Sequence, residues 1–177
     1  MMRLVRALTG VGLMLVLTPP AVAPAAGNNA TTLTPLPDGT QLETFSRLDC
    51  HPANGSCDFT VGADRKSADG VIGFPNDLWS RQSTTIRPNS RTAYLDVHAT
   101  AQYDRVMKDG GADEVTTIYM GEGPLEKYQT VGRIDATDWH TGQPRLNINV
   151  ISCTHIQVVY SGVNITSPST CAQANFS

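Results

Sequence analysis

The sequence predicts an all-β protein: an antiparallel β-sandwich of about eight strands, immunoglobulin-like or jelly-roll-like, after a cleaved signal peptide. Three observations lead to this fold class. Apolar and polar residues alternate along several segments, turns rich in Gly and Pro separate those segments, and no stretch carries apolar residues at helical spacing. Short strands and turns at regular intervals are typical of sandwiches and barrels.

The first 25 residues have the layout of a secretory signal peptide. Arg3 and Arg6 precede an apolar run over 7–18, and small residues follow as far as Ala25. The run is shorter than the ~20 apolar residues that a membrane-spanning helix needs. We therefore expect cleavage after Ala25, export to the cell envelope or the medium, and no stable membrane insertion after cleavage.

One domain is expected after the leader (residues 1–25). Residues 26–39 are polar, contain prolines and lack periodicity, so we expect a flexible N-terminal segment there. Residues 40–177 then form a single β-sandwich domain, a length typical of one folding unit. Two of the 13 basic residues lie in the leader, whereas all 16 acidic residues lie after it. The exported chain is acidic and has no basic cluster, so nucleic acid is not an expected partner.

The clearest strand signal runs over residues 91–103. One face carries small and apolar side chains and the other carries polar ones, with Tyr94 the only bulky residue out of step. The apolar set is Ala93, Leu95, Val97, Ala99, Ala101 and Tyr103. Residues 115–120 are rich in β-branched and aromatic side chains, and a Gly-rich turn lies between this segment and 91–103. We expect 91–103 and 114–121 to pair as a hairpin.

Weaker alternation recurs in three other segments, at residues 57–63, 146–150 and 156–160. The first of them follows Asn54-Gly55, a dipeptide that favours a tight hairpin turn. Each segment predicts a strand with one face turned to the core.

Four cysteines, all in the exported part, predict two disulfides: they are Cys50, Cys57, Cys153 and Cys171. The short paired spacing of a structural zinc site is absent. We expect Cys50–Cys57 and Cys153–Cys171 because cysteines that are neighbours in sequence meet most often. The alternative is a long bridge between Cys57 and Cys153, whose separation is wider than the immunoglobulin pattern allows.

The loop over residues 135–142 is the most suggestive place for chemistry. It contains Asp135, Asp138, Trp139 and His140. Two carboxylates and an imidazole have the chemistry of a metal site or an acid–base pair, and a tryptophan can stack on a sugar ring. The interpretation we favour is structural, with Asp138 capping a turn and Trp139 covering an edge of the core. No spacing matches a ligand rule, so neither a metal nor a cofactor is predicted.

Strong scaffold signals without a catalytic motif favour an exported, non-enzymatic β-sandwich that presents loops to a partner. That partner is an unidentified protein or glycan outside the cytosol, such as an envelope component or a host molecule. One alternative is a small secreted hydrolase or lyase that acts on a glycan or lipid through Asp135, Asp138 and His140. Another is a lipid carrier, which would need an apolar cavity between the sheets.

Overall fold

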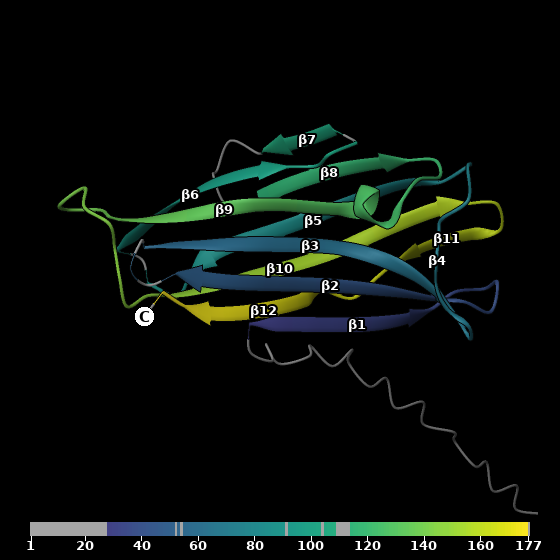
Figure 1. The fold of residues 1–177 in the computed structure, drawn as a ribbon, viewed down its shortest axis with the longest axis horizontal. Helices are drawn as coiled ribbons and strands as arrows, with labels where there is room; N and C mark the ends of the chain where they lie inside the picture. The colour runs from purple at the N-terminus through teal and green to yellow at the C-terminus, as the bar shows by residue number, and fades with distance from the viewer. Residues whose placement is uncertain are drawn as a thin grey trace, which may run out of the picture.

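The protein folds as two antiparallel six-stranded sheets packed face to face, a β-sandwich (Figure 1). The computed structural model describes residues 28–51, 53, 55–90, 92–103, 105–108 and 114–176. The predicted signal peptide lies outside these residues. The described chain contains twelve strands instead of the expected eight or so, together with the short 3₁₀ helix η2 (Leu125–Tyr128). The fold class predicted by the sequence is confirmed.

Sheet A has the strand order β1-β2-β3-β9-β6, and β4 pairs with the last three residues of β3. Its strands are β1 (Asn29–Pro35), β2 (Gln41–His51), β3 (Ser56–Ser67), β4 (Gly70–Ile72), β6 (Ala93–Thr100) and β9 (Gln129–Asp138).

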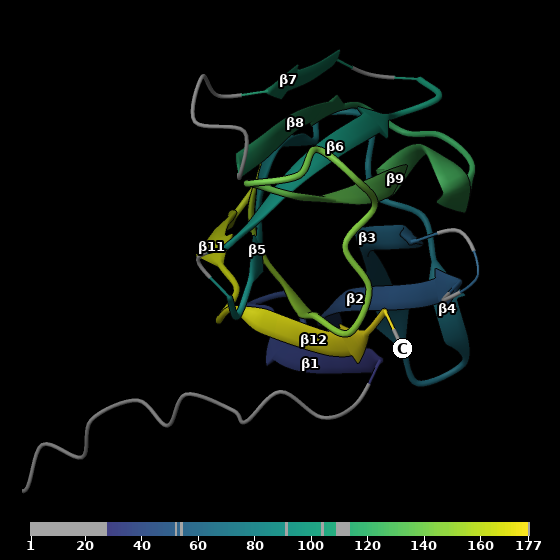
Figure 2. The same ribbon diagram turned by 90° about the vertical axis from the view of Figure 1, so that its left-hand side faces the viewer.

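Sheet B has the order β11-β10-β5-β8-β7, and β12 also pairs with β10. Its strands are β5 (Trp79–Pro88), β7 (Arg105–Lys108), β8 (Glu114–Met120), β10 (Asn149–Tyr160), β11 (Val163–Thr166) and β12 (Thr170–Asn175). The two sheets come together along one side, where β12 lies beside β1 and β2 (Figure 2).

The expected flexible segment over residues 26–39 is a wrong prediction for most of its length. Residues 29–35 form β1, which pairs with β2 from Asn29↔Arg47 to Pro35↔Gln41. Most side chains of β1 are small or polar, and its one large apolar residue, Leu33, is exposed, so periodicity gave no signal. Ladder hydrogen bonds and the packing of Ala30 against the core hold the strand instead.

The predicted hairpin between 91–103 and 114–121 does not form. β6 pairs with β9 in sheet A, whereas β8 pairs with β5 and β7 in sheet B. Within β6 the alternation was predicted correctly, because Leu95 and Val97 are buried while Tyr94 and His98 are exposed. Tyr103, which was expected on the buried face, lies beyond the end of the strand and is 50% exposed. Alternation fixes which face of a strand is buried, but long-range packing decides which strand lies next to it.

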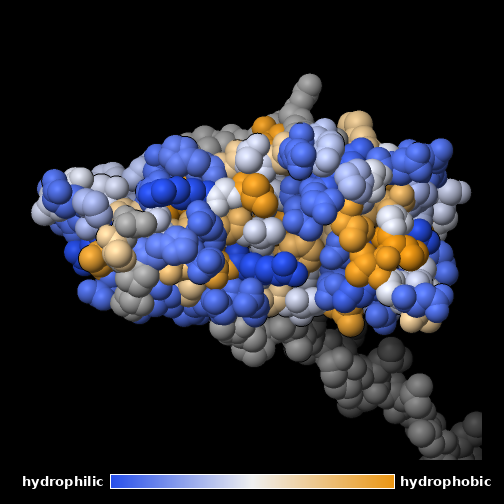
Figure 3. Space-filling view, in the orientation of Figure 1, coloured by the Kyte–Doolittle hydropathy of each residue, from blue (hydrophilic) through white to orange (hydrophobic). Residues whose placement is uncertain are grey.

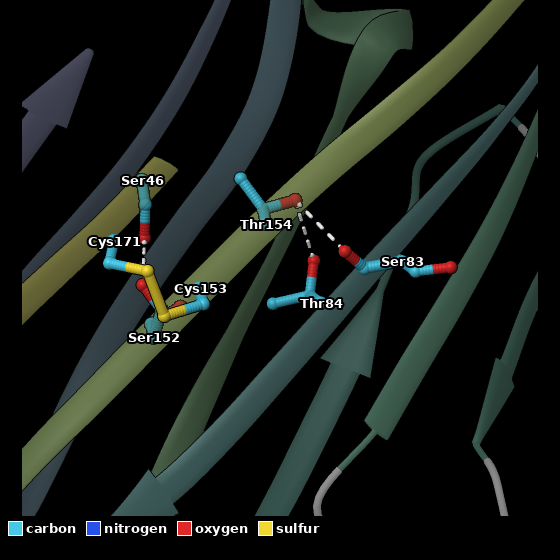
Figure 4. The surroundings of a disulfide bond; sticks show 7 residues. All are labelled: Ser46, Ser83, Thr84, Ser152, Cys153, Thr154 and Cys171. Atoms are coloured by element: carbon cyan, nitrogen blue, oxygen red, sulfur yellow. Dashed lines mark hydrogen bonds between the residues drawn. A yellow bond between two sulfur atoms is a disulfide. The ribbon is translucent and has the colours of Figure 1, made fainter. Parts of the chain in front are cut away.

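Both predicted disulfides are confirmed, and each joins residues directly opposite each other on neighbouring strands. Cys50–Cys57 crosses the β2–β3 hairpin, and Cys153–Cys171 joins β10 to β12 (Figure 4). Loop-closure entropy gives about 2.5 kcal/mol for the first bridge and about 3 kcal/mol for the second. The second bridge therefore anchors the C-terminal strand β12 to β10 of sheet B.

Two apolar clusters fill the space between the sheets, one toward each end. The first is built around Phe59, Ile134 and Val150, and the second around Tyr119 and Tyr128. Phe59 packs across Gly132 on β9, where a side chain would meet the Phe59 ring and the carbonyl of His98. A glycine at this position lets β9 lie close to both of its neighbours.

A belt of hydrogen-bonded polar side chains separates the two clusters. On β8, for example, Val115 belongs to the first cluster, Thr117 to the belt, and the ring of Tyr119 to the second cluster. The members of this polar belt are fully or almost fully buried: Gln82, Thr84, Thr117, Thr130 and Thr154, with the hydroxyl of Tyr119. Hydrogen bonds offset the cost of burying polar groups, so the contacts within the belt favour one way for the sheets to meet.

Thr130 on β9 is the centre of the polar belt and its link between the sheets. Its hydroxyl lies 2.7 Å from the hydroxyl of Thr117, 2.7 Å from that of Tyr119 and 3.1 Å from the amide nitrogen of Gln82. The three partners all belong to sheet B.

The belt extends toward the second disulfide, as Figure 4 shows. The Thr84 and Thr154 hydroxyls are 3.0 Å apart. Ser46 on β2 donates to the carbonyl oxygen of Ser152 on β10, which is a second polar link between the sheets.

A polar junction ties the sheets together beside the second apolar cluster, where the β1–β2 turn meets the end of β10. Asp38, in the β1–β2 turn, accepts hydrogen bonds from Thr40, from Arg65 on β3 and from the Tyr160 hydroxyl on β10. Burial tends to raise the pKa of Asp38, but the bonds from Thr40 and Tyr160 and the charge of Arg65 outweigh it and lower that pKa to about 2. Burial and the bond to Asp38 raise the pKa of Tyr160 to about 12.

Replacing Thr130 with Val should destabilise the domain by about 1–3 kcal/mol, because buried partners in sheet B lose a hydrogen bond without gaining water. Chemical denaturation measures this loss. Thr85→Val is the matched control, because Thr85 is exposed on β5. An equal effect of the two substitutions would show that the polar belt does not stabilise the fold.

The junction at Asp38 should make stability depend on acid. Because the folded pKa of about 2 lies below the unfolded value near 3.8, the ionised carboxyl stabilises the fold above pH 4, and this stabilisation disappears as pH falls toward 2. Asp38→Asn should therefore lower the melting temperature at pH 6 but have little effect near pH 2. Asp69→Asn, at an exposed turn, is the control. A gap between wild type and Asp38→Asn that stays constant with pH would contradict this assignment.

Candidate functional site: the turn after β9

The predicted loop forms a turn at one end of the sandwich, between β9 and β10. Figure 2 shows the segment between these strands crossing the end of the molecule that faces the viewer. Main-chain hydrogen bonds hold it: Gly142 donates to Asp138, Asp138 to Gln143, and Arg145 to Ala136. The segment is therefore an ordered part of the scaffold.

The Asp138 carboxylate organises this turn, as the structural interpretation of the sequence predicted. One oxygen accepts hydrogen bonds from the backbone N–H groups of His140 and Thr141 and from the Thr141 hydroxyl. The other lies 2.6 Å from the Arg145 guanidinium. The bond from the Thr141 N–H is the main cause that lowers the pKa of Asp138, and burial opposes it only in part.

Trp139 was expected to cover an edge of the core, and this expectation is wrong. The residue is 71% exposed. Its backbone N–H, however, donates to the carbonyl of Thr92 at 3.1 Å, which extends the β6–β9 ladder by one bond. The hydrogen bonds that Asp138 accepts fix the backbone of the turn, and in this conformation the side chain of Trp139 is exposed to water.

Tyr94 on β6 lies on the same outer face of sheet A. It is directly opposite Thr137, two residues before Trp139, and is 44% exposed. Diagonal neighbours of this kind lie about 7–8 Å apart, within reach of aromatic side chains. We call Tyr94 and Trp139 the aromatic pair. The sequence signal for Tyr94 was present, since it was the one bulky residue on the polar face of its strand.

The structure does not bring Asp135, Asp138 and His140 together as a catalytic group. Asp135 faces outward on β9 and pairs with Arg133 at 2.9 Å, whereas Asp138 is buried within the turn. His140 meets Asp138 through its backbone N–H, and the residue is exposed. Within the described ranges, no group of three or more His, Cys, Asp or Glu side chains is placed to hold a metal ion.

The outer face of sheet A around this site is largely hydrophilic (Figure 3). Ion pairs cover it, including His51–Asp58, Asp96–His98 and Arg133–Asp135. The aromatic pair, together with Val131 on β9, adds exposed apolar surface to this otherwise polar face.

Comparison with known proteins adds no family assignment. No protein-family model and no curated protein sequence matches the chain. Among solved structures, the chain is similar to one described as "pH-induced modulation of Streptococcus parasanguinis adhesion by Fap1 fimbriae". The TM-score is 0.36 and the sequence identity 7%, over 83% of this chain and 88% of that chain. A likeness this low carries no conclusion about function.

The two disulfides point to a protein that resides outside the reducing cytosol. In the part of the chain that the structure describes, no helix is long and apolar enough to cross a membrane.

Loosening the turn should free Trp139. A Trp79→Phe background leaves Trp139 as the single tryptophan. In this background we expect Asp138→Asn to lower the fluorescence anisotropy of Trp139. The neutral amide of Asn forms weaker hydrogen bonds with Arg145 and with the N–H groups of the turn than the carboxylate does. Asp135→Asn is the control, since that carboxylate lies outside the turn. Unchanged anisotropy in Asp138→Asn would show that the carboxylate does not hold the tryptophan in place.

Proposed function

We propose that this protein is an exported, non-enzymatic binding module that holds a protein or glycan of the cell envelope or a host at the aromatic pair. The observation that carries the proposal is an exposed tryptophan on an immobilised turn. Exposing an indole to water is unfavourable, and a rigid aromatic loses little conformational entropy when it is covered by a partner. Residues of this kind dominate the affinity of binding surfaces.

The geometry supports the two alternatives less well. A hydrolase or lyase acting through Asp135, Asp138 and His140 needs the three side chains around one reacting atom, and here they point to different surroundings. A lipid carrier needs an apolar interior that is open to an acyl chain. The polar belt crosses the middle of the interior between the two apolar clusters, where such a chain would have to lie.

Binding is tested with the mature protein and the purified envelope fraction of the cell that exports it, by co-sedimentation. Trp139→Ala should weaken saturable binding at least tenfold and Tyr94→Ala several-fold, because loss of a central aromatic costs more than about 1.4 kcal/mol. Trp79→Ala is the matched control, since Trp79 is an exposed tryptophan on sheet B.

Melting temperatures establish that all three variants remain folded. Wild-type binding by folded Trp139→Ala would contradict the proposal, and so would an equal loss in the Trp79→Ala control.

A further inference from the structure

Strand β1 presents an open main-chain edge at the margin of sheet A. It is the first strand in the order β1-β2-β3-β9-β6 and, among the strands that the structure describes, it forms a ladder with β2 alone. Figures 1 and 2 both show β1 as the outermost strand on this side of the sandwich. An open strand edge is a template for pairing with another strand.

One hydrogen bond assigns the main-chain groups that face this edge. The Leu48 N–H donates to the Asn28 carbonyl at 2.8 Å, so residue 28 belongs to a hydrogen-bonded pair with β2. From there the register runs without a bulge to the end of β1. Because hydrogen-bonded and open pairs alternate along an antiparallel ladder, the N–H and C=O groups of Asn29, Thr31 and Leu33 face away from β2.

The residues that carry these open groups are accessible. Asn29 and Thr31 are exposed, and Leu33 is 51% exposed. On the inner face, Ala30 packs against the first apolar cluster. Strand β12 contacts β1 but leaves Ala30 and Thr32 partly exposed, so it does not enclose the strand.

β1 also lacks most of the features with which proteins protect an exposed edge. It has no charged residue, and its one proline, Pro35, is its last residue. The other edge of sheet A is different, because Leu95 and Val97 of β6 are buried. β7 and β11 have four residues each and β4 has three, which is short for pairing.

The outer face of β1 has a projection near one end and a hollow at the other. The projection is Leu33, the one large apolar side chain of the strand. The hollow, of about 400 Å³, lies beside the start of β1, and Asn29, Arg47 and Thr60 are among the residues that line it.

We propose that β1 pairs antiparallel with β1 of a second copy of this chain, about a two-fold axis at Thr31, to form one continuous sheet across the dimer. Thr31 then faces its own symmetry mate, and Asn29 faces Leu33 of the second copy. Each of these pairs exchanges two hydrogen bonds, because their main-chain groups are the open ones.

This register is the one in which every pair is complete. A shift in one direction brings Pro35, which has no N–H, into a pair with Asn29. A shift in the other direction moves Leu33 past the first residue of the partner strand. Two threonines directly opposite each other are also a favourable cross-strand pair.

The side chains of the two edges fit the same register. The exposed Leu33 of each copy lies beside Asn29 of the other, at the rim of the hollow, so apolar surface is covered on both sides of the axis. No charged side chain of β1 has to leave water when the edges meet. A two-fold interface requires a surface that complements itself, and β1 satisfies this in main chain and side chains.

Sedimentation equilibrium of the mature protein tests the dimer, and wild type should show a reversible monomer–dimer equilibrium. Thr31→Lys sets two ammonium groups against each other at the axis, and Thr31→Glu sets two carboxylates there, so each variant alone should be monomeric. An equimolar mixture of the two should form dimers again, because an ammonium group of one copy then faces a carboxylate of the other.

Two further variants separate strand pairing from other contacts. Thr31→Pro removes an N–H that faces the open edge without removing a bond to β2, so a folded monomer is expected. Thr100→Lys is the control and should still dimerise, because Thr100 is an exposed threonine on β6 of the same sheet. Melting temperatures establish that the variants are folded.

Cysteine crosslinking tests the register. Under mild oxidation Thr31→Cys should form a covalent dimer, since directly opposite residues lie within reach of a disulfide. Leu33→Cys should not, because the two copies of this residue are about 14 Å apart along the paired strands.

Wild type that stays monomeric at about 100 μM overturns the proposal, because an interface of biological use would assemble by then. A dimer that survives in folded Thr31→Pro, a mixture of charge variants that stays monomeric, or crosslinking of Leu33→Cys in place of Thr31→Cys overturns it as well.

Discussion

The arrangement of the two sheets depends on the polar belt between them. Apolar side chains stabilise contact between sheets but specify it only loosely, because dispersion and burial have no preferred direction. Hydrogen bonds do have a preferred direction. With the Thr130 hydroxyl bonded to three groups of sheet B, a shift of one sheet over the other would leave several buried polar atoms without partners. The belt therefore fixes the sheet positions, and the two apolar clusters stabilise the contact between the sheets. Each disulfide joins two strands within one sheet.

A scaffold held in this way can carry a rigid display site at its end. β9 contributes both Thr130, at the centre of the polar belt, and Asp138, whose carboxylate orders the turn that follows. Trp139 is thus positioned by the same strand that joins the sheets. β6, which pairs with β9, supplies Tyr94, the second member of the aromatic pair.

Sequence reasoning predicted the features that depend on local pattern. The sandwich class, the buried face of β6, both disulfides and the capping role of Asp138 follow from alternation, cysteine spacing and turn chemistry. It missed β5, the central strand of sheet B, because the inward side chains Ser80, Gln82 and Thr84 are polar and conceal the alternation. It misplaced Trp139 because composition favours burial of an indole, whereas the hydrogen bonds to Asp138 and Thr92 decide the direction of the turn. The order of the strands could not be predicted from the sequence, because it depends on packing between segments that are far apart along the chain.

Residue-resolved hydrogen exchange tests the central claim most directly. If the polar belt locks the sheets together, the backbone amides of Gln82 and Thr130 should exchange only through global unfolding, with an opening free energy equal to that from denaturant unfolding. Exchange of these two amides through local opening, at a free energy well below the global value, would contradict the account and show that the sheets can part in the middle while the molecule stays folded.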